Sequence, residues 1–216
     1  FEHLLAESQI LLLPAGYAPL DQPGGSGRFY AALLRQPRIR EAFEALLARD
    51  GLVLGIGSGF QALLKTGLLP GGRFCDPQAD APALAVNAAG WHRNRFLTTK
   101  VCSVCSPWLS LCEVGETFVL PVSGGEGRLT ASPDQLATLA EAGQIATRYV
   151  DPAGHPASCD TYNPTGSAGA VEGLSSPCGR ILGKSAHSER VVAGTPVNIP
   201  GLREQPLLAA GVRHFS

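Results

Sequence analysis

The feature that most constrains the fold of this chain is an apolar run that passes through a glycine turn into a helix. Leu52–Ile56 is continuously apolar, as expected for a strand buried on both faces of a sheet. Gly57-Ser58-Gly59 follows at once, and residues 60–64 have helical character until Gly67. Strand, sharp glycine turn and helix in this order predict the geometry of a nucleophile elbow.

The pattern around this turn predicts an α/β fold in one domain, residues 1–216. Residues 9–13 are a short apolar run stopped by Pro14-Ala15-Gly16, a Gly/Pro-rich loop occupies residues 21–27, and two helical stretches meet near Pro37. Further strands are predicted at residues 96–101, 117–121, 144–150, 168–174 and 180–182, with a helix at 134–142 opened by Ser132-Pro133 and a terminal helix after residue 202. Early apolar strands joined through helices indicate a parallel sheet, which the later hairpin-like strands extend.

Composition excludes several classes of function. The 216 residues carry a formal net charge of -1, which argues against a nucleic-acid partner, since such a partner normally requires a basic excess. No apolar run approaches the roughly 20 residues that span a bilayer, so no membrane partner is expected. The chain contains no Met and opens with no signal peptide. We therefore expect a cytoplasmic fragment of a longer protein.

The cysteines predict neither a disulfide framework nor a metal site. Six are present, and without a secretory signal we expect free thiols. Cys102 and Cys105 have zinc-knuckle spacing and Cys112 is a possible third ligand, but no local His completes the set. Gly183-Lys184-Ser185 spells the end of a phosphate loop, yet Cys178 occupies the position of the first glycine, so we expect no phosphate site there.

Two motifs point to acyl-transfer chemistry. Residues 55–61, with the sequence GIGSGFQ, resemble the G-x-C-x-G-x-Q stretch of class I glutamine amidotransferases, and His187 and Glu189 match their H-x-E pair. In that family a thiolate at the turn attacks an amide, backbone N–H groups stabilise the oxyanion, the His is the base and the Glu orients it. On a strand, His187 and Glu189 would lie on the same side.

Within that family the chain resembles the glutaminase domain of phosphoribosylformylglycinamidine synthase, from about Ser8 to its end. The matching stretches are residues 50–56, 59–63, 106–110, 121–128, 162–167, 173–174, 179–183 and 187–190. The resemblance implies a three-layer, flavodoxin-like fold with a mainly parallel sheet flanked by helices. It also implies that the family's first strand and helix are missing and that the chain is the C-terminal part of a longer synthase.

The resemblance also implies ligands and partners. The glutaminase releases ammonia from glutamine, and a separate synthetase domain or subunit, with ATP and Mg, adds it to formylglycinamide ribonucleotide; the glutaminase domain itself needs no cofactor. The positions that match the glutamine site are Gly16, Ser58, Gln61, Gly124 and Asn163. The ordinary alternatives are a solvated helix-start glutamine for Gln61 and a plain β-turn for residues 163–166.

The chain departs from the family at the site itself. Gly57-Ser58 replaces Cys-Asn, Gly124 replaces a His, and Ala15 replaces the first Gly of a P-G-G loop. Gly57 has no side chain that can attack an amide, and Ser58, one position along a tight turn, is expected to miss His187. The glutaminase step is therefore predicted to be lost or severely impaired.

Three readings follow from this loss. The domain can still dock on its synthetase as a structural lid and leave that enzyme to use free ammonia. It can instead be a pseudo-glutaminase, a structural or regulatory module that binds glutamine or a partner. The third reading is a decayed, truncated gene product without a selected role.

Overall fold

The computed structural model describes residues 1–16, 25–76, 78–192 and 197–216. The helices are α1 (Glu2–Glu7), α2 (Gly25–Leu34), α3 (Pro37–Ala48), α4 (Ser58–Lys65), α5 (Leu68–Gly71), α6 (Pro133–Glu141) and α7 (Leu207–Arg213), with 3₁₀ turns η1 (Pro107–Leu109), η2 (Ala168–Ala170) and η3 (Ser188–Arg190). The strands are β1 (Ile10–Leu13), β2 (Leu52–Ile56), β3 (Ala83–Ala85), β4 (Arg93–Val101), β5 (Thr117–Gly124), β6 (Arg128–Thr130), β7 (Ile145–Tyr149), β8 (Val171–Ser175) and β9 (Ile181–Lys184).

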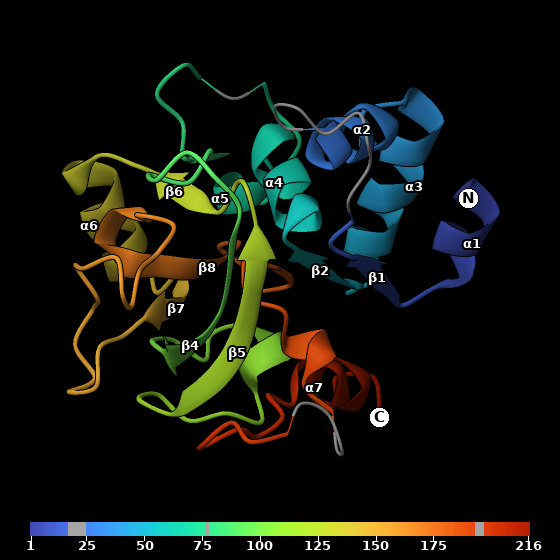
Figure 1. The fold of residues 1–216 in the computed structure, drawn as a ribbon. Coiled ribbons are helices and arrows are strands. Elements are labelled where there is room, and N and C mark those ends of the chain that lie inside the picture. Colours follow the sequence, from blue (N-terminus) through green and yellow to red (C-terminus); the bar gives the residue numbers. More distant parts are fainter. Residues whose placement is uncertain (17–24, 77, 193–196) are drawn as a thin grey trace.

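A large sheet organises the molecule in the order β1-β2-β9-β8-β7-β4-β5 (Figure 1). The pairings β1·β2 and β2·β9 are parallel, and β9·β8, β8·β7, β7·β4 and β4·β5 are antiparallel. As a result β1, β2, β9, β7 and β5 share one direction, while β8 and β4 run against them. The predicted α/β class, with early parallel strands extended by later hairpin-like ones, is confirmed.

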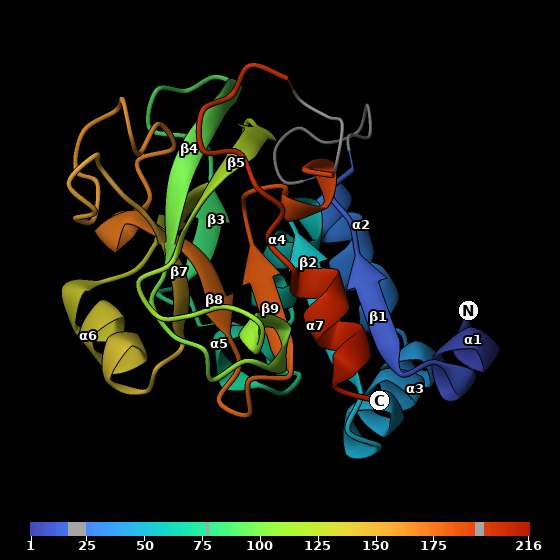
Figure 2. The same cartoon turned by 90° about the horizontal axis from the view of Figure 1, so that it is seen from below.

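Two apolar cores cover the two faces of this sheet and make three layers. One core packs the six helices from α1 through α6 against the sheet, with residues such as Phe43, Phe60 and Leu63. The other core packs η1 and α7 against the sheet, with Trp108 and Leu207. Figures 1 and 2 show α2, α3 and α4 grouped on one side of β1 and β2, with α7 apart from them. Every residue of β2 is buried because its side chains meet both cores in alternation.

The boundaries differ from the predicted ones in a few places. The loop expected at 21–27 ends sooner, because α2 already begins at Gly25; residues 21–24 lie outside the described part. The strand expected from residue 168 begins only at Val171, after the 3₁₀ turn η2, where Gly169 has φ 57°. The helix predicted after Ser132 is confirmed, with Ser132 and Gln135 forming a capping box.

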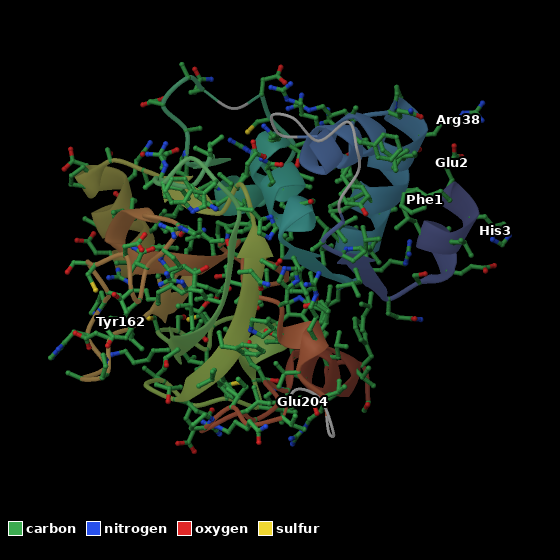
Figure 3. The ribbon with its side chains drawn as sticks, in the orientation of Figure 1. Phe1, Glu2, His3, Arg38, Tyr162 and Glu204 are labelled. Atoms are coloured by element: carbon green, nitrogen blue, oxygen red, sulfur yellow. The ribbon has the colours of Figure 1, made fainter. Side chains whose placement is uncertain are left out.

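Segments far apart in the sequence lie on opposite sides of the molecule. Figure 3 shows Phe1, Glu2 and His3, at the start of α1, on one side and Tyr162, in the loop before η2, on the other. The turn between β2 and α4 lies between these two sides, where β2 is flanked by β1 and β9 (Figure 2). The sheet therefore holds that turn on three adjacent parallel strands.

Candidate active site

The elbow predicted at Gly57 is formed between β2 and α4. Gly57 has φ 54° and ψ -107°, a conformation that L side chains rarely adopt. Its N–H donates to the carbonyl of Lys184 on β9 at 2.9 Å, and its carbonyl accepts the N–H of Gln61 at 3.0 Å. Because the first N–H groups of α4 have no partner within the helix, the turn offers backbone donors beside position 57.

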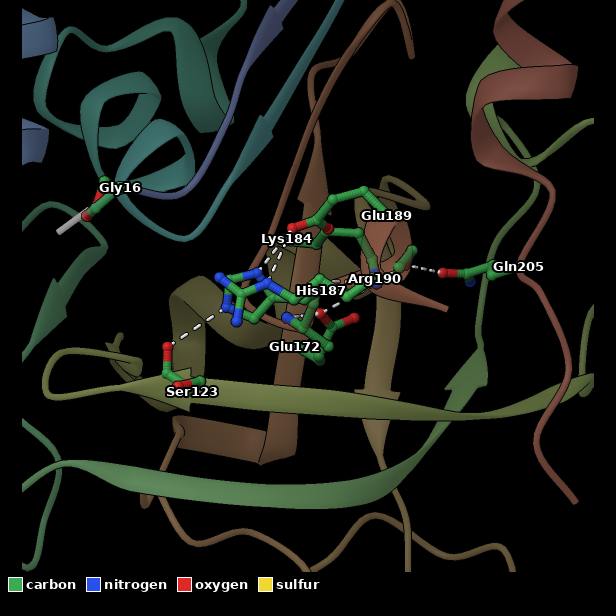
Figure 4. Close-up of polar contacts among 11 residues, drawn as sticks. Gly16, Ser123, Glu172, Lys184, His187, Glu189, Arg190 and Gln205 are labelled. Carbon is green, nitrogen blue, oxygen red and sulfur yellow. Dashed lines mark hydrogen bonds and ion pairs between the residues drawn. The ribbon is translucent and has the colours of Figure 1, made fainter. Parts of the chain in front are cut away.

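His187 and Glu189 meet as predicted, but not on a strand. His187 is the N-cap of η3, so the two side chains are brought together by a 3₁₀ turn instead of strand alternation. Nδ1 of His187 lies 2.8 Å from Oε1 of Glu189, and Nε2 lies 3.4 Å from the carbonyl of Ser123 on β5 (Figure 4). The backbone N–H of His187 donates to Pro121 at 2.8 Å, which ties this turn to β5.

The charge on Glu189 suits the role of an orienting carboxylate. Burial raises the pKa of Glu189, but the contacts with His187, a backbone N–H and the charge of Arg190 together lower it more, so the pKa lies below its ordinary value. Nε of Arg190 lies 3.7 Å from the same oxygen, Oε1. Glu189 therefore stays ionised at neutral pH and can hold the imidazole of His187 in one orientation.

A cleft of about 490 Å³ opens beside the elbow. Its lining brings together six of the eight residues predicted for the site: Gly16, Gly57, Ser58, Gln61, Gly124 and His187. Glu189 contacts His187 without lining the cleft, and Asn163 is also absent from the lining. The predicted site is thus one concave space with the elbow on one wall and the histidine on another.

Gln61 is held inside this cleft and is not a solvated helix-start residue. Its side chain is only 5% exposed, and its Nε2 donates to Oε2 of Glu126 at 2.8 Å. A Cβ at Gly27 of α2 would lie 2.0 Å from Oε1 of Gln61, so only a glycine allows α2 to approach so closely. Sequence reasoning missed Glu126, although it stands two residues after Gly124 in the stretch already singled out.

The positions expected to depart from the family pattern, Ala15, Gly57, Ser58 and Gly124, all line the cleft beside the elbow. A Cβ added at Gly57 would lie 3.0 Å from Cβ of Ala15, which is tighter than most such contacts. The hydroxyl of Ser58 donates to the carbonyl of Gly16 at 3.0 Å. At Gly124, in contrast, an added Cβ would meet nothing closer than the N atom of Glu126 at 4.0 Å. Position 124 therefore has room for a larger side chain, whereas position 57 does not.

Asn163 is engaged by its own loop. Its amide donates to the carbonyls of Ala157 and Ser167, and its Oδ1 accepts the N–H of Ser167 at 3.0 Å. Thr165, two residues further on, lines the cleft. The turn around Asn163 therefore shapes the wall on which Thr165 stands, and its side-chain bonds account for the residue by themselves.

Sequence reasoning also missed residues on the rim of the cleft. Trp91, His92, Ser123 and Arg190 line it, and Nε2 of His92 lies 3.0 Å from Oγ of Ser123. His92 precedes β4 and Ser123 lies on β5, next to Gly124. No motif marks His92, and only the β4·β5 pairing brings it to the site.

All six cysteines are free thiols. Among residues 1–16, 25–76, 78–192 and 197–216, no group of three or more His, Cys, Asp or Glu side chains is placed to hold a metal ion. No helix formed by the described residues combines the length and apolarity needed to cross a membrane.

Comparison with known proteins assigns the chain to a family. The family described as CobB/CobQ-like glutamine amidotransferase domain matches residues 2–215. The chain belongs to this family. Two similar relatives carry the name phosphoribosylformylglycinamidine synthase subunit PurQ. The protein from Symbiobacterium thermophilum is 35% identical over 206 residues, which cover 95% of this chain and 79% of the relative, and that from Synechococcus sp. is 34% identical over 212 residues, 98% and 81%.

A solved structure supports the fold. The structure of PurLQS from Thermotoga maritima contains a chain that matches this amidotransferase domain with a TM-score of 0.70 at 22% identity, covering 97% of this chain and 81% of that one. At this identity the match establishes the fold, and it agrees with the class I amidotransferase architecture expected from the sequence.

Proposed function

We propose that this chain is the glutamine amidotransferase domain of a phosphoribosylformylglycinamidine synthase of purine biosynthesis and that its glutaminase step is lost. Relatives of that name match more than nine-tenths of the chain, which supports the assignment. The loss rests on one observation: the residue with elbow geometry, φ 54° and ψ -107° at the start of α4, is Gly57. A glycine offers no atom that can form a thioester.

The rest of the site supplies the base and the oxyanion donors that a nucleophile at this turn would need. His187, oriented by Glu189 at 2.8 Å, would accept its proton, and the free N–H groups at the start of α4 would stabilise the oxyanion. Ser58 does not take over, since its hydroxyl is turned to the carbonyl of Gly16 at 3.0 Å. Gly57 therefore removes one component from an otherwise assembled constellation.

The domain would act beside a synthetase. We propose that it docks on the synthetase part of phosphoribosylformylglycinamidine synthase in the cytoplasm and serves as a structural lid while that part uses free ammonia. The name of the matched Thermotoga maritima structure, PurLQS, supports a partner subunit for this domain. ATP and Mg²⁺ belong to the synthetase in this scheme, and the amidotransferase domain carries no cofactor.

The test is glutamate release from glutamine by matched variants. The parent is expected to be silent. Gly57→Cys introduces the thiol, but Cβ of Ala15 at 3.0 Å crowds it, so Gly57→Cys combined with Ala15→Gly and Gly124→His is expected to be the most active variant. His187→Ala in this triple variant should abolish turnover, which separates elbow chemistry from a contaminating glutaminase.

Hydrolysis by the parent would overturn the proposed loss of activity, and Ser58→Ala would then show whether Ser58 is the nucleophile. A silent triple variant, assayed with its synthetase added, would overturn the assignment of Gly57 as the nucleophile position. The folding of each variant is checked by circular dichroism, because a side chain at position 57 strains the backbone there.

A second function, a pseudo-glutaminase that binds without hydrolysing, is favoured by the intact cleft. The cleft keeps about 490 Å³ and a buried Gln61–Glu126 hydrogen bond on its wall. Isothermal titration calorimetry with glutamine tests this binding. Glu126→Gln is the variant that should weaken it, and Glu44→Gln, at an exposed position of α3, is the control. Absence of heat with the folded parent would exclude glutamine as the ligand of this cleft.

A further inference from the structure

A fully buried ion pair lies beside His187 and η3, the turn that His187 caps. Nζ of Lys184 on β9 is 3.3 Å from Oε1 of Glu172 on β8, and both side chains are 0% exposed. The hydroxyl of Thr147 on β7 donates to the other oxygen of Glu172. Two charges are removed from water only at a large free-energy cost, which is offset when good geometry and further hydrogen bonds satisfy them.

The remaining bonds of this pair converge on the two neighbours of His187. Oε1 of Glu172 accepts the N–H of Ala186 at 2.6 Å, while Nζ of Lys184 donates to Oγ of Ser188 at 2.9 Å and reaches the carbonyl of Ala186 at 3.5 Å. The pair therefore holds the chain immediately before and immediately after His187 (Figure 4).

The same segment is tied to the elbow and to the C-terminal region. The carbonyl of Lys184 accepts the N–H of Gly57 at 2.9 Å, so one residue links the ion pair to the turn on the other wall of the cleft. The hydroxyl of Ser188 donates to Oε1 of Gln205, just before α7, at 2.7 Å. Residues 184–188 are thus fixed at their start, middle and end.

We propose that Glu172 and Lys184 are positioning residues that set the place of His187 relative to the elbow. An apolar pair of similar volume would fill the same space, but it could bond neither Ala186 nor Ser188. His187 itself is held by its backbone N–H to Pro121, by its carbonyl to the N–H of Arg190 at 3.2 Å, and by its ring to Glu189 and, at 3.4 Å, to the carbonyl of Ser123. The significance of this placement rests on the function proposed for His187.

The test replaces the charges together, because removing one leaves the other buried and unpaired and can unfold the protein. Glu172→Leu/Lys184→Met is compared with the parent and with Arg40→Ala/Glu44→Ala, which removes an exposed pair on α3. The readouts are the melting temperature, the downfield proton resonance of Nδ1 of His187 in its hydrogen bond to Glu189, and the rate of carbethoxylation of His187.

His3 supplies the internal reference for carbethoxylation, since its side chain is 80% exposed at the edge of the molecule (Figure 3), whereas His187 is 1% exposed. We expect the Leu/Met variant to unfold cooperatively near the parent temperature, to lose the downfield resonance, and to show modification of His187 faster by roughly tenfold relative to His3, as local opening becomes easier. The α3 control should match the parent.

A folded Leu/Met variant with the resonance intact and His187 still protected would overturn the proposal and leave the pair a purely structural feature. If that variant does not fold, Ser188→Ala decides, because it deletes the hydroxyl that Lys184 bonds; Gln205→Ala, which removes the other bond of that hydroxyl and leaves Lys184 its partner, is the control. Protection of His187 in Ser188→Ala that equals the parent's overturns the proposal. None of these readouts requires glutamine or turnover, so failure here is distinct from failure of the proposed function.

Discussion

Replacing Gly57 by alanine measures the elbow directly. With φ 54° and ψ -107°, a non-glycine residue costs on the order of 1–3 kcal/mol in backbone strain. The added Cβ lies 3.0 Å from Cβ of Ala15, and overpacking of this kind costs roughly 1 kcal/mol more. The free energy of unfolding should therefore fall by roughly 2–4 kcal/mol, which lowers the melting temperature of a chain of this length by roughly 4–16 °C.

Urea denaturation followed by circular dichroism gives the required free energies, and a double-mutant cycle separates the two causes. Combined with Ala15→Gly, Gly57→Ala should cost about 1 kcal/mol less than it does alone, because only the contact is relieved. Gly90→Ala is the matched control: φ is 79° there, and an added Cβ meets no atom within 4 Å. That variant should show only a backbone penalty of about 1 kcal/mol.

Two results would refute this reasoning. A Gly57→Ala or Gly57→Cys variant that melts at or above the parent temperature would mean that position 57 is not strained and that no elbow exists there. A double-mutant cycle with no coupling energy between positions 57 and 15 would be consistent with backbone strain at position 57 but would rule out the steric contact with Ala15. In that case Gly57→Cys alone should regain as much activity as its combination with Ala15→Gly.

Three further predictions concern residues around the site and the scaffold. Gly27→Ala should destabilise the fold by about 1–2 kcal/mol in urea titrations and disturb ligand binding, since the new Cβ would displace Gln61 at 2.0 Å; unchanged stability would show that α2 can move away. Ser132→Ala should cost about 1 kcal/mol by the same measurement through loss of the capping box, and an unchanged midpoint would contradict that cap. The pKa of Glu189 is lowered in the folded protein, so its carboxylate stabilises the fold above the pKa of the unfolded state, and this stabilisation is lost as pH falls through the lower folded value. Glu189→Gln should therefore flatten the dependence of the free energy of unfolding on pH on the acid side. An unaltered pH dependence would exclude this carboxylate as its source.

The sequence predicted the elements that depend on local pattern. The run Leu52–Ile56 alternates between two cores, so its apolar character was sufficient to predict a buried strand. Ser132-Pro133 marked the start of α6 for local reasons of capping. The order of strands was not accessible in this way, because placing β9 between β2 and β8 requires pairing across more than a hundred residues.

The same division holds at the site. Gly57 and the His187–Glu189 pair were predicted from short motifs, and the structure brings Gly57 and His187 to one cleft, with Glu189 bonded to His187 outside its lining. The proximity of His187 and Glu189 comes from the 3₁₀ turn η3, into which the chain passes after β9, and not from the alternation of a strand. His92 was missed since nothing in its local sequence distinguishes it, and only the β4·β5 pairing carries it there.

The distribution of changes around the cleft bears on why the site persists. Ala15, Gly57 and Gly124 all line the cleft, and a Cβ at position 57 would lie 3.0 Å from Cβ of Ala15. The principal buried polar contacts around this space are formed: Gln61 is bonded to Glu126 at 2.8 Å, and the Glu172–Lys184 pair bonds Ala186 and Ser188 on either side of His187. Undirected decay would be expected to break buried polar contacts as readily as to remove a nucleophile, since a single unpaired buried charge costs about 3–5 kcal/mol. On the proposal that Gly57 stands in place of a nucleophile, a cleft with these contacts formed favours a domain kept for docking or binding over a decayed gene product.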